Sequence, residues 1–82
     1  MTEMPKADKT LDARGLMCPM PILKAKKEIK TMEIGQTLEV LSGDEGSKED
    51  FPRWANRTGN EFLGIFENDE EDFARYFIKR VV

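Results

Sequence analysis

The stretch Arg14-Gly15-Leu16-Met17-Cys18-Pro19-Met20-Pro21 separates an extended segment of the chain from a helical one. It contains the only cysteine of the 82 residues and two of the four prolines. Proline has a fixed φ angle and no backbone N–H, so it fits the first turn of a helix, where amides have no partner inside the helix. We therefore expect a helix to begin at Pro19, with Cys18 at or near its N-cap.

The segments on either side of this stretch predict a strand, a helix and a second strand. Residues 9–12 form a short extended segment after a polar, flexible tail at residues 1–8. After Pro19, apolar residues recur every three or four positions, which predicts a helix that ends before Gly35. Residues 37–41 predict the second strand.

The second half of the chain predicts one more helix and two more strands. Ser47 is placed to cap the helix, and Gly59 to end it. The inner face of this helix is expected to carry Phe51, Trp54, Ala55 and Thr58. Strands are expected at residues 61–67 and 72–80, joined by an acidic hairpin loop at residues 68–71.

The predicted order is βαβαββ. The first crossover should make its two strands parallel, and the last two strands should pair as an antiparallel hairpin. Two helices cannot cover both faces of a four-stranded sheet, so both are expected on one face. The prediction is an α+β fold, a two-layer α/β sandwich with a mixed four-stranded sheet, in a single domain at residues 9–82.

The face of the sheet away from the helices poses a question. Strict alternation places Leu63 and Ile65 on one face of the third strand, and Phe62 and Phe66 on the other. Apolar side chains on the open face have two explanations. They form a surface for a partner, or they are scattered aromatics covered by the aliphatic stems of Arg75, Lys79 and Arg80.

Composition excludes several classes of function. Hydrophobic residues make up 39% and charged residues 35%, and the net charge is -3, which is unusual for a dedicated nucleic-acid binder. With no histidine and one cysteine, a structural zinc site, histidine acid–base catalysis, a Ser/His/Asp triad and a Cys-x-x-Cys redox pair are all excluded. We expect no metal and no cofactor. No apolar run approaches the ~20 residues that cross a bilayer, and the N-terminus lacks an apolar signal region, so a cytoplasmic location is expected.

Cys18 is the first candidate for chemistry. The positive end of the helix dipole favours its thiolate. Because Pro19 and Pro21 lack an N–H, only Met20 and Ile22 remain as amide donors in the first turn, and we expect a moderate lowering of the thiol pKa. The prolines instead display the thiol rigidly, which suits handing an atom to a partner. The alternative, a buried cysteine that serves only packing, is equally open on the residues alone.

Residues 11–21, Leu11-Asp12-Ala13-Arg14-Gly15-Leu16-Met17-Cys18-Pro19-Met20-Pro21, closely resemble the signature of the TusA/SirA-like sulfur carriers, a Cys-Pro-x-Pro motif after an Arg/Leu-Gly-Leu turn. The similarity continues through Leu23-Lys24, Leu38-Glu39-Val40, Asp50-Phe51-Pro52, Gly59-Asn60-Glu61-Phe62-Leu63 and Phe77-Ile78-Lys79. The resemblance implies a βαβαββ sandwich and a sulfurtransferase role. Cys18 would accept a sulfane sulfur as a persulfide and pass it to a protein thiol. The motif residues implied to support Cys18 are Arg14, Gly15, Leu16, Pro19 and Pro21.

The resemblance also implies partners. The sulfur donor would be a cysteine desulfurase or a rhodanese-like protein, and the acceptor a DsrE/TusD-like protein, in tRNA thiolation, molybdenum cofactor supply or sulfur metabolism. A monomer in transient complexes is expected, without direct contact to nucleic acid or membrane. Candidate docking residues are Met17, Met20, Lys24, Lys27 and Asp44.

Three alternatives remain. The thiol could carry a thiosulfonate group in sulfur oxidation. The chain could instead be a non-catalytic redox or regulatory module that binds proteins. RNA binding through the lysine-rich first helix is weaker, because the acidic balance and the run Asp69-Glu70-Glu71-Asp72 oppose it.

Overall fold

The computed structural model describes residues 4–17 and 19–82. Its elements are β1 (Lys9–Asp12), α1 (Met20–Lys30), β2 (Thr37–Ser42), α2 (Ser47–Thr58), β3 (Glu61–Glu67) and β4 (Ala74–Lys79). The predicted βαβαββ order is confirmed. Within the part of the chain that the structure describes, neither helix is long and apolar enough to cross a lipid bilayer.

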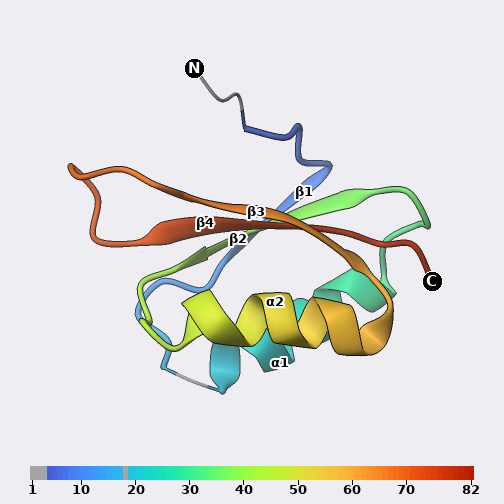
Figure 1. Cartoon of the computed structure of the whole chain (residues 1–82), viewed down its shortest axis with the longest axis horizontal. Helices are drawn as coiled ribbons and strands as arrows, with labels where there is room; N and C mark the ends of the chain where they lie inside the picture. The colour runs from blue at the N-terminus through green and yellow to red at the C-terminus, as the bar shows by residue number, and fades with distance from the viewer. Residues whose placement is uncertain (1–3, 18) are drawn as a thin grey trace.

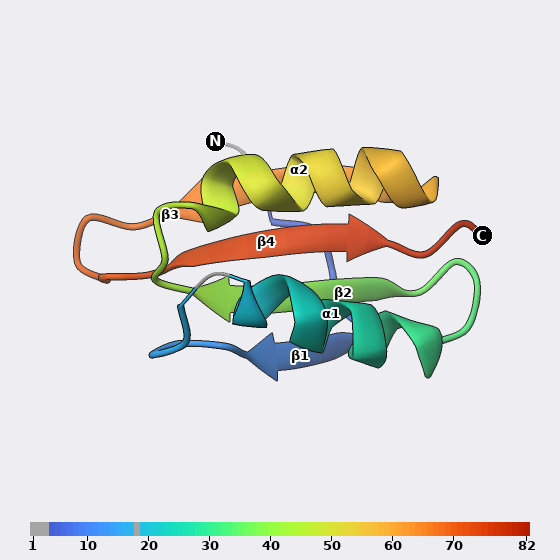
Figure 2. The same cartoon turned by 90° about the horizontal axis from the view of Figure 1, so that it is seen from below.

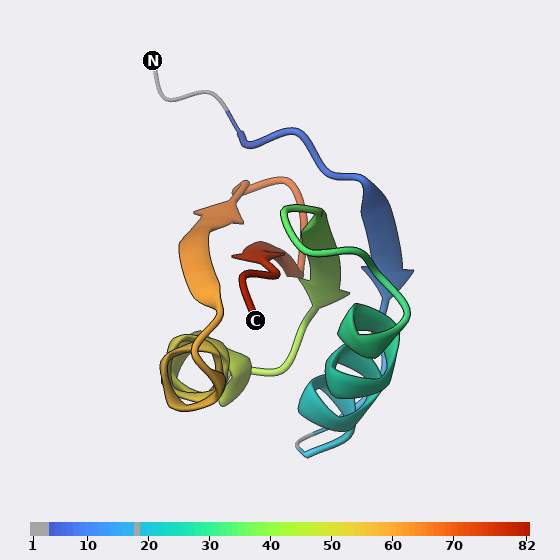
Figure 3. The same cartoon turned by 90° about the vertical axis from the view of Figure 1, so that its right-hand side faces the viewer.

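The four strands form one mixed sheet in the order β1-β2-β4-β3 (Figure 2). β1 runs parallel to β2, and β4 runs antiparallel to both of its neighbours, β2 and β3. Both helices cover the same face of the sheet (Figures 1 and 3). The α+β two-layer fold predicted from the sequence is therefore confirmed, including the parallel first pair and the antiparallel hairpin.

The hydrophobic core lies between the sheet and the helices. It is built from Ala13, Ala25, Ile29, Met32, Leu38, Val40, Phe51, Trp54, Ala55, Ala74, Tyr76 and Ile78. Phe51 of α2 stacks on the ring of Tyr76 at 4.8 Å and meets Trp54 edge-on at 6.2 Å. Aromatic pairs of these geometries stabilise a core beyond the area that they bury, so this cluster fixes α2 on the sheet.

The start of α1 differs by one residue from the prediction. Pro19 is the N-cap and Met20 is the first helical residue, with the buried Pro21 immediately after it. Both prolines still occupy positions whose N–H would have no partner inside the helix. Pro21 therefore anchors the first turn in the interior, while Met17, Pro19 and Met20 stay exposed.

Ser47 does not cap α2, contrary to the sequence prediction. Gly46 is the N-cap, and no side chain caps this end. Ser47 is the first helical residue, and its hydroxyl lies 3.0 Å from that of Ser42 at the end of β2. This buried pair joins the strand to the helix. Gly59 ends the helix as predicted, with a φ of 86°.

The inner face of α2 also ends one turn earlier than expected. Phe51, Trp54 and Ala55 are buried, but Thr58 is exposed. The Thr58 hydroxyl donates to the carbonyl oxygens of Trp54 at 3.0 Å and Ala55 at 3.1 Å.

A register shift in β3 breaks the alternation expected there. Phe62 pairs with Ile78, but the next pair along is Gly64 with Phe77. Leu63 is therefore an extra residue in β3 that has no partner in β4. As a result Phe62 and Ile65 both pack against the core on the helix side. The prediction that Phe62 and Ile65 face opposite ways is wrong, because strict alternation assumes a regular strand.

The open face of the sheet is largely covered. Phe77 is only 1% exposed, and Phe66 meets it edge-on at 5.4 Å. The chain before β1 passes on this side of the sheet (Figures 1 and 3), and Met4 lines a hollow there together with Phe66 and Arg75. Arg75 is held by ion pairs to Glu39 and Glu71. These contacts favour covered aromatics over a docking surface.

Arg80 does not cover that face, contrary to one sequence-based explanation. Its guanidinium donates to the carbonyl oxygens of Ile29 at 3.1 Å and Lys30 at 3.2 Å, and also to that of Met32. These carbonyls lie at the C-terminal end of α1, where a cation interacts favourably with the helix dipole. Arg80 therefore ties α1 to the end of β4.

Burial predicts which isoleucine matters for stability. Ile78 is fully buried, whereas Ile34 is 68% exposed. We expect Ile78→Ala to lower the free energy of unfolding by about 2–5 kcal/mol, because it leaves a cavity. The matched variant Ile34→Ala should change it by less than about 0.5 kcal/mol. Urea denaturation measures both, and equal effects would contradict the core described above.

Candidate functional site

Cys18 lies outside the described residues, but the chain on both sides of it is defined. The preceding loop leaves β1 at Ala13, which is buried, and Pro19 begins α1. The backbone N–H of Ala13 donates to the carbonyl oxygen of Leu41 at 2.8 Å, which extends the pairing of β1 and β2 by one bond. The loop therefore starts from a fixed point at the edge of the sheet.

A bidentate ion pair between Asp12 and Arg14 shapes the first turn of this loop. Arg14 donates from Nε to Oδ1 at 2.8 Å and from Nη2 to Oδ2 at 2.9 Å, and its backbone N–H donates to Oδ1 at 3.1 Å. These bonds lower the pKa of Asp12 to about 2. They raise the pKa of Arg14. Gly15 follows with a φ of 83°, a conformation that side chains with a Cβ rarely adopt.

Phe73 connects the loop to the β3–β4 hairpin. The guanidinium carbon of Arg14 lies 5.0 Å from the centroid of the Phe73 ring, and that of Arg75 lies at the same distance. A guanidinium within ~6 Å of an aromatic centroid is attracted to the ring. Arg14 thus has two partners, a carboxylate in β1 and a ring just before β4, which together fix the turn before Cys18.

The amides at the start of α1 are partly occupied. The Met20 N–H donates to the carbonyl oxygen of Met17 at 2.9 Å. The expected donation from Met20 and Ile22 to the thiol involves Cys18, which lies outside the described residues, so it stays a prediction. The first turn contains no acidic residue, so no side-chain charge there opposes the positive end of the helix dipole.

Exposed apolar side chains lie close to Cys18 in the sequence. Met17 is 76% exposed, Met20 42% and Leu23 48%. Lys24 and Lys27 are exposed on the same helix. A hollow between the helices is lined by Pro19, Ile22, Asp50, Arg53, Trp54 and Arg57. The sequence analysis missed Arg53 and Arg57, because only the packing of α2 beside α1 brings them to Pro19.

A cavity of about 510 Å³ lies on the other side of the loop. Three segments line it: Arg14, Gly15, Leu16 and Met17 from the loop, Gly43, Asp44 and Glu45 after β2, and Asp72 and Phe73 before β4. Asp44, a candidate docking residue, is thus brought beside the loop. Glu45, Asp72 and Phe73 were not identified from the sequence, because nothing in their local pattern indicates that the hairpin reaches this edge.

The family model described as "Sulfurtransferase TusA" matches residues 9–80. The chain belongs to the TusA family. It is 46% identical over 71 residues to the sulfur carrier protein TusA of Allochromatium vinosum, covering 87% of this chain and 90% of that protein. It is 43% identical over 75 residues to the putative sulfur carrier protein YrkI of Bacillus subtilis, covering 92% and 97% respectively.

Two further relatives extend the comparison. The putative sulfur carrier protein YrkF of Bacillus subtilis is 44% identical over 77 residues, and these cover 94% of this chain but only 40% of YrkF. The crystal structure of the SirA-like protein from Desulfitobacterium hafniense matches with a TM-score of 0.78 and 27% identity, covering 90% of this chain and 99% of that one. The TusA-family chain is therefore a sulfur carrier by family, with the same fold as the SirA-like protein.

The pKa of Asp12 tests the ion pair that shapes the loop. In an NMR titration of its carboxyl carbon we expect a midpoint near 2 in the wild-type chain, and one near the ordinary value of 3.8 in Arg14→Ala. Because the folded-state pKa is depressed, the stabilisation is complete above the ordinary value and is lost as the pH falls through about 2.

Lys26→Ala is the control for this titration, since it removes an exposed positive charge elsewhere. Its Asp12 midpoint should stay near that of the wild type. An equal rise of the Asp12 midpoint in both variants would show that the net charge of the chain, and not the contact with Arg14, sets the pKa of Asp12.

Proposed function

We propose that Cys18 carries sulfur as a persulfide between two proteins. The observation that supports this most is the family match over residues 9–80, which includes Cys18, the only cysteine of the chain. The setting agrees with it: the flanking residues Met17 and Met20 are exposed, and the turn before the thiol is held by Arg14. The motif residues Gly15, Leu16, Pro19 and Pro21 would keep the loop in shape.

The proposed transfer consists of two thiol exchange steps. The Cys18 thiolate attacks the terminal sulfur of a persulfide on the donor, a new S–S bond forms, and the donor cysteine leaves as a thiolate. A thiolate of the acceptor then attacks the terminal sulfur on Cys18, and Cys18 leaves as a thiolate. Neither step requires an oxidant, a reductant or a dedicated base, which agrees with a chain that has no histidine.

The absence of a second cysteine from the sequence favours a carrier. A second thiol in the same chain could attack the persulfide and release the sulfur as an internal disulfide forms. We propose a cysteine desulfurase or rhodanese-like protein as the donor and a DsrE/TusD-like protein as the acceptor. A thiol that cycles through a persulfide suits a reducing compartment such as the cytoplasm.

Intact-mass spectrometry tests the proposal directly. After incubation with a sulfur-loaded cysteine desulfurase or with polysulfide, the folded chain should gain the mass of one sulfur atom, and a reductant should remove it. Cys18→Ser should gain nothing. An adduct of thiosulfonate mass after incubation with tetrathionate, without a persulfide adduct from the other donors, would support the sulfur-oxidation alternative instead. The redox or regulatory alternative predicts no sulfur adduct from any donor.

The lysines of α1 give a second test, on docking. Lys24 lies near the middle of α1 and Lys27 in its last turn, both are exposed, and we propose that they attract an acidic surface of a partner, beside Met17, Met20 and Asp44. Replacing both lysines by alanine should slow persulfide loading by the desulfurase about threefold to tenfold at low salt, since charge steering sets association rates.

The matched control is Lys26→Ala with Lys30→Ala, which removes the same charge from the same helix. Loading of this variant should stay close to the wild-type rate. If both double variants load equally slowly, net charge matters and a specific docking role for Lys24 and Lys27 is contradicted.

A further inference from the structure

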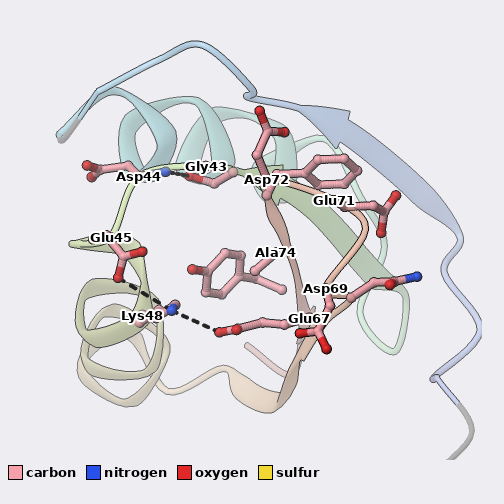
Figure 4. Close-up of a pocket in the computed structure, with 13 residues that line it drawn as sticks. Gly43, Asp44, Glu45, Lys48, Glu67, Asp69, Glu71, Asp72 and Ala74 are labelled. Carbon is pink, nitrogen blue, oxygen red and sulfur yellow. Dashed lines mark hydrogen bonds and ion pairs between the residues drawn. The ribbon is translucent and has the colours of Figure 1, made fainter.

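A second, strongly acidic cavity adjoins the one beside the Cys18 loop. Its volume is about 400 Å³, and Gly43, Asp44, Glu45, Asp72 and Phe73 line both cavities. Together they make a continuous depression, here called the acidic groove, from the loop at Met17 to the β3–β4 hairpin. The second cavity is lined by six acidic residues and one basic residue, Lys48. Figure 4 shows the carboxylates arranged around it.

Two cations of the described chain line the groove: Arg14, whose carboxylate partner is Asp12, and Lys48. The Lys48 ammonium lies 3.4 Å from a carboxylate oxygen of Glu45 and 3.0 Å from one of Glu67, and so bridges two segments of the wall (Figure 4). These two carboxylates raise the pKa of Lys48. Within the described part of the chain, Asp69 and Asp72 make no such ion pair. The hairpin side of the groove therefore has negative charge that no residue of the described chain neutralises by contact.

A buried hydroxyl provides a second, independent observation. Tyr76 lines the cavity and is fully buried, yet its hydroxyl has no hydrogen-bond partner in the described structure. The charged groups that act on this phenol are those of the groove: Lys48, Glu67, Glu45 and Asp44. A buried hydroxyl without a partner is unfavourable. Its oxygen can accept a hydrogen bond from a cationic N–H group that enters from the groove.

We propose that the acidic groove binds a lysine- or arginine-rich segment of the protein that exchanges sulfur with Cys18. This rests on the proposed function, because the segment would bring its protein to the Cys18 loop. In the described chain no three acidic side chains are grouped closely enough to hold a metal ion. The carboxylates are instead spread along the groove, as are the charges of a basic peptide. A nucleic acid would be repelled by them.

The two charged regions beside the loop differ in sign. Lys24 and Lys27 of α1 lie on the helix side, while Asp69 and Asp72 belong to the hairpin side. A partner with a basic segment next to an acidic surface would fit in one orientation only, since the reverse orientation places like charges together. The groove therefore contributes orientation as well as affinity.

Peptide binding tests the proposal. The probe is a fluorescently labelled hexapeptide of alternating lysine and glycine, and its control has glutamine in place of lysine. At low salt the full chain should bind the lysine peptide and not the glutamine peptide, and added salt should weaken the binding. In Asp69→Asn with Asp72→Asn the dissociation constant should rise about fivefold.

The matched control is Glu33→Gln with Glu61→Gln, which neutralises two exposed carboxylates outside the groove. This variant should bind like the wild type. Equal weakening in both double variants, or no binding to the wild type, would overturn the proposal. Tyr76→Phe should fold with undiminished stability in urea denaturation but bind the peptide about twofold to fivefold more weakly; unchanged binding would overturn the role of the hydroxyl.

Sulfur loading by polysulfide separates this inference from the proposed function. Polysulfide is a small donor that needs no protein docking, so the groove variants should still gain sulfur on Cys18. If every variant fails to load while the lysine peptide still binds, the carrier function is contradicted and the groove is not. If sulfur loading is normal but the groove variant and its Glu33/Glu61 control bind the lysine peptide equally well, only the proposed binding of a basic segment in the groove is contradicted.

Discussion

The parallel pairing of β1 with β2 is the constraint on which the site depends. It places Asp12 opposite Leu41, so the loop that holds Cys18 and the loop after β2 leave the sheet at the same edge. The antiparallel strands add a third segment there, because Ala74 pairs with both Ser42 and Glu67, and the β3–β4 hairpin turns beyond that pair. Three segments far apart in sequence, at residues 14–17, 43–45 and 72–73, therefore line one cavity beside the loop that contains Cys18.

The fold followed closely from the sequence, because its signals are local. The spacing of apolar residues predicted α1, and Gly59 predicted the end of α2. Predictions failed where a tertiary contact overrode a local preference. Ser47 has the right side chain for a cap, but Ser42 lies within hydrogen-bond reach of it. The extra residue at Leu63 has no signature in the sequence, and it alone reverses the face on which Phe62 lies.

The site was predictable only in part. The motif allows residues 14–21 to be recognised in the sequence. The residues elsewhere in the chain that hold this loop in place have no such motif. Arg14 depends on Phe73, which is 59 positions away and follows an acidic hairpin whose composition indicates only a solvent-exposed turn. The carboxylates of the β3–β4 hairpin could not be assigned to a site from the sequence either, because there they resemble an acidic run that only aids solubility. The pairing of β4 between β2 and β3 brings them to the wall of a groove that reaches the Cys18 loop.

Under the proposed function the Cys18 thiol must both receive and release sulfur, and the proline-rich entry to α1 suits that task. A thiolate stabilised by many amide donors is a good leaving group but a weak nucleophile. A thiolate without such donors is a stronger nucleophile but a poorer leaving group. In this chain Pro19 and Pro21 have no N–H to donate, and the Met20 N–H is already donated to Met17. The helix dipole remains, with no acidic side chain in the first turn to oppose it. We infer that a helix start with few free amides and an unopposed dipole suits the proposed two-way transfer, since it favours a thiolate without binding it strongly.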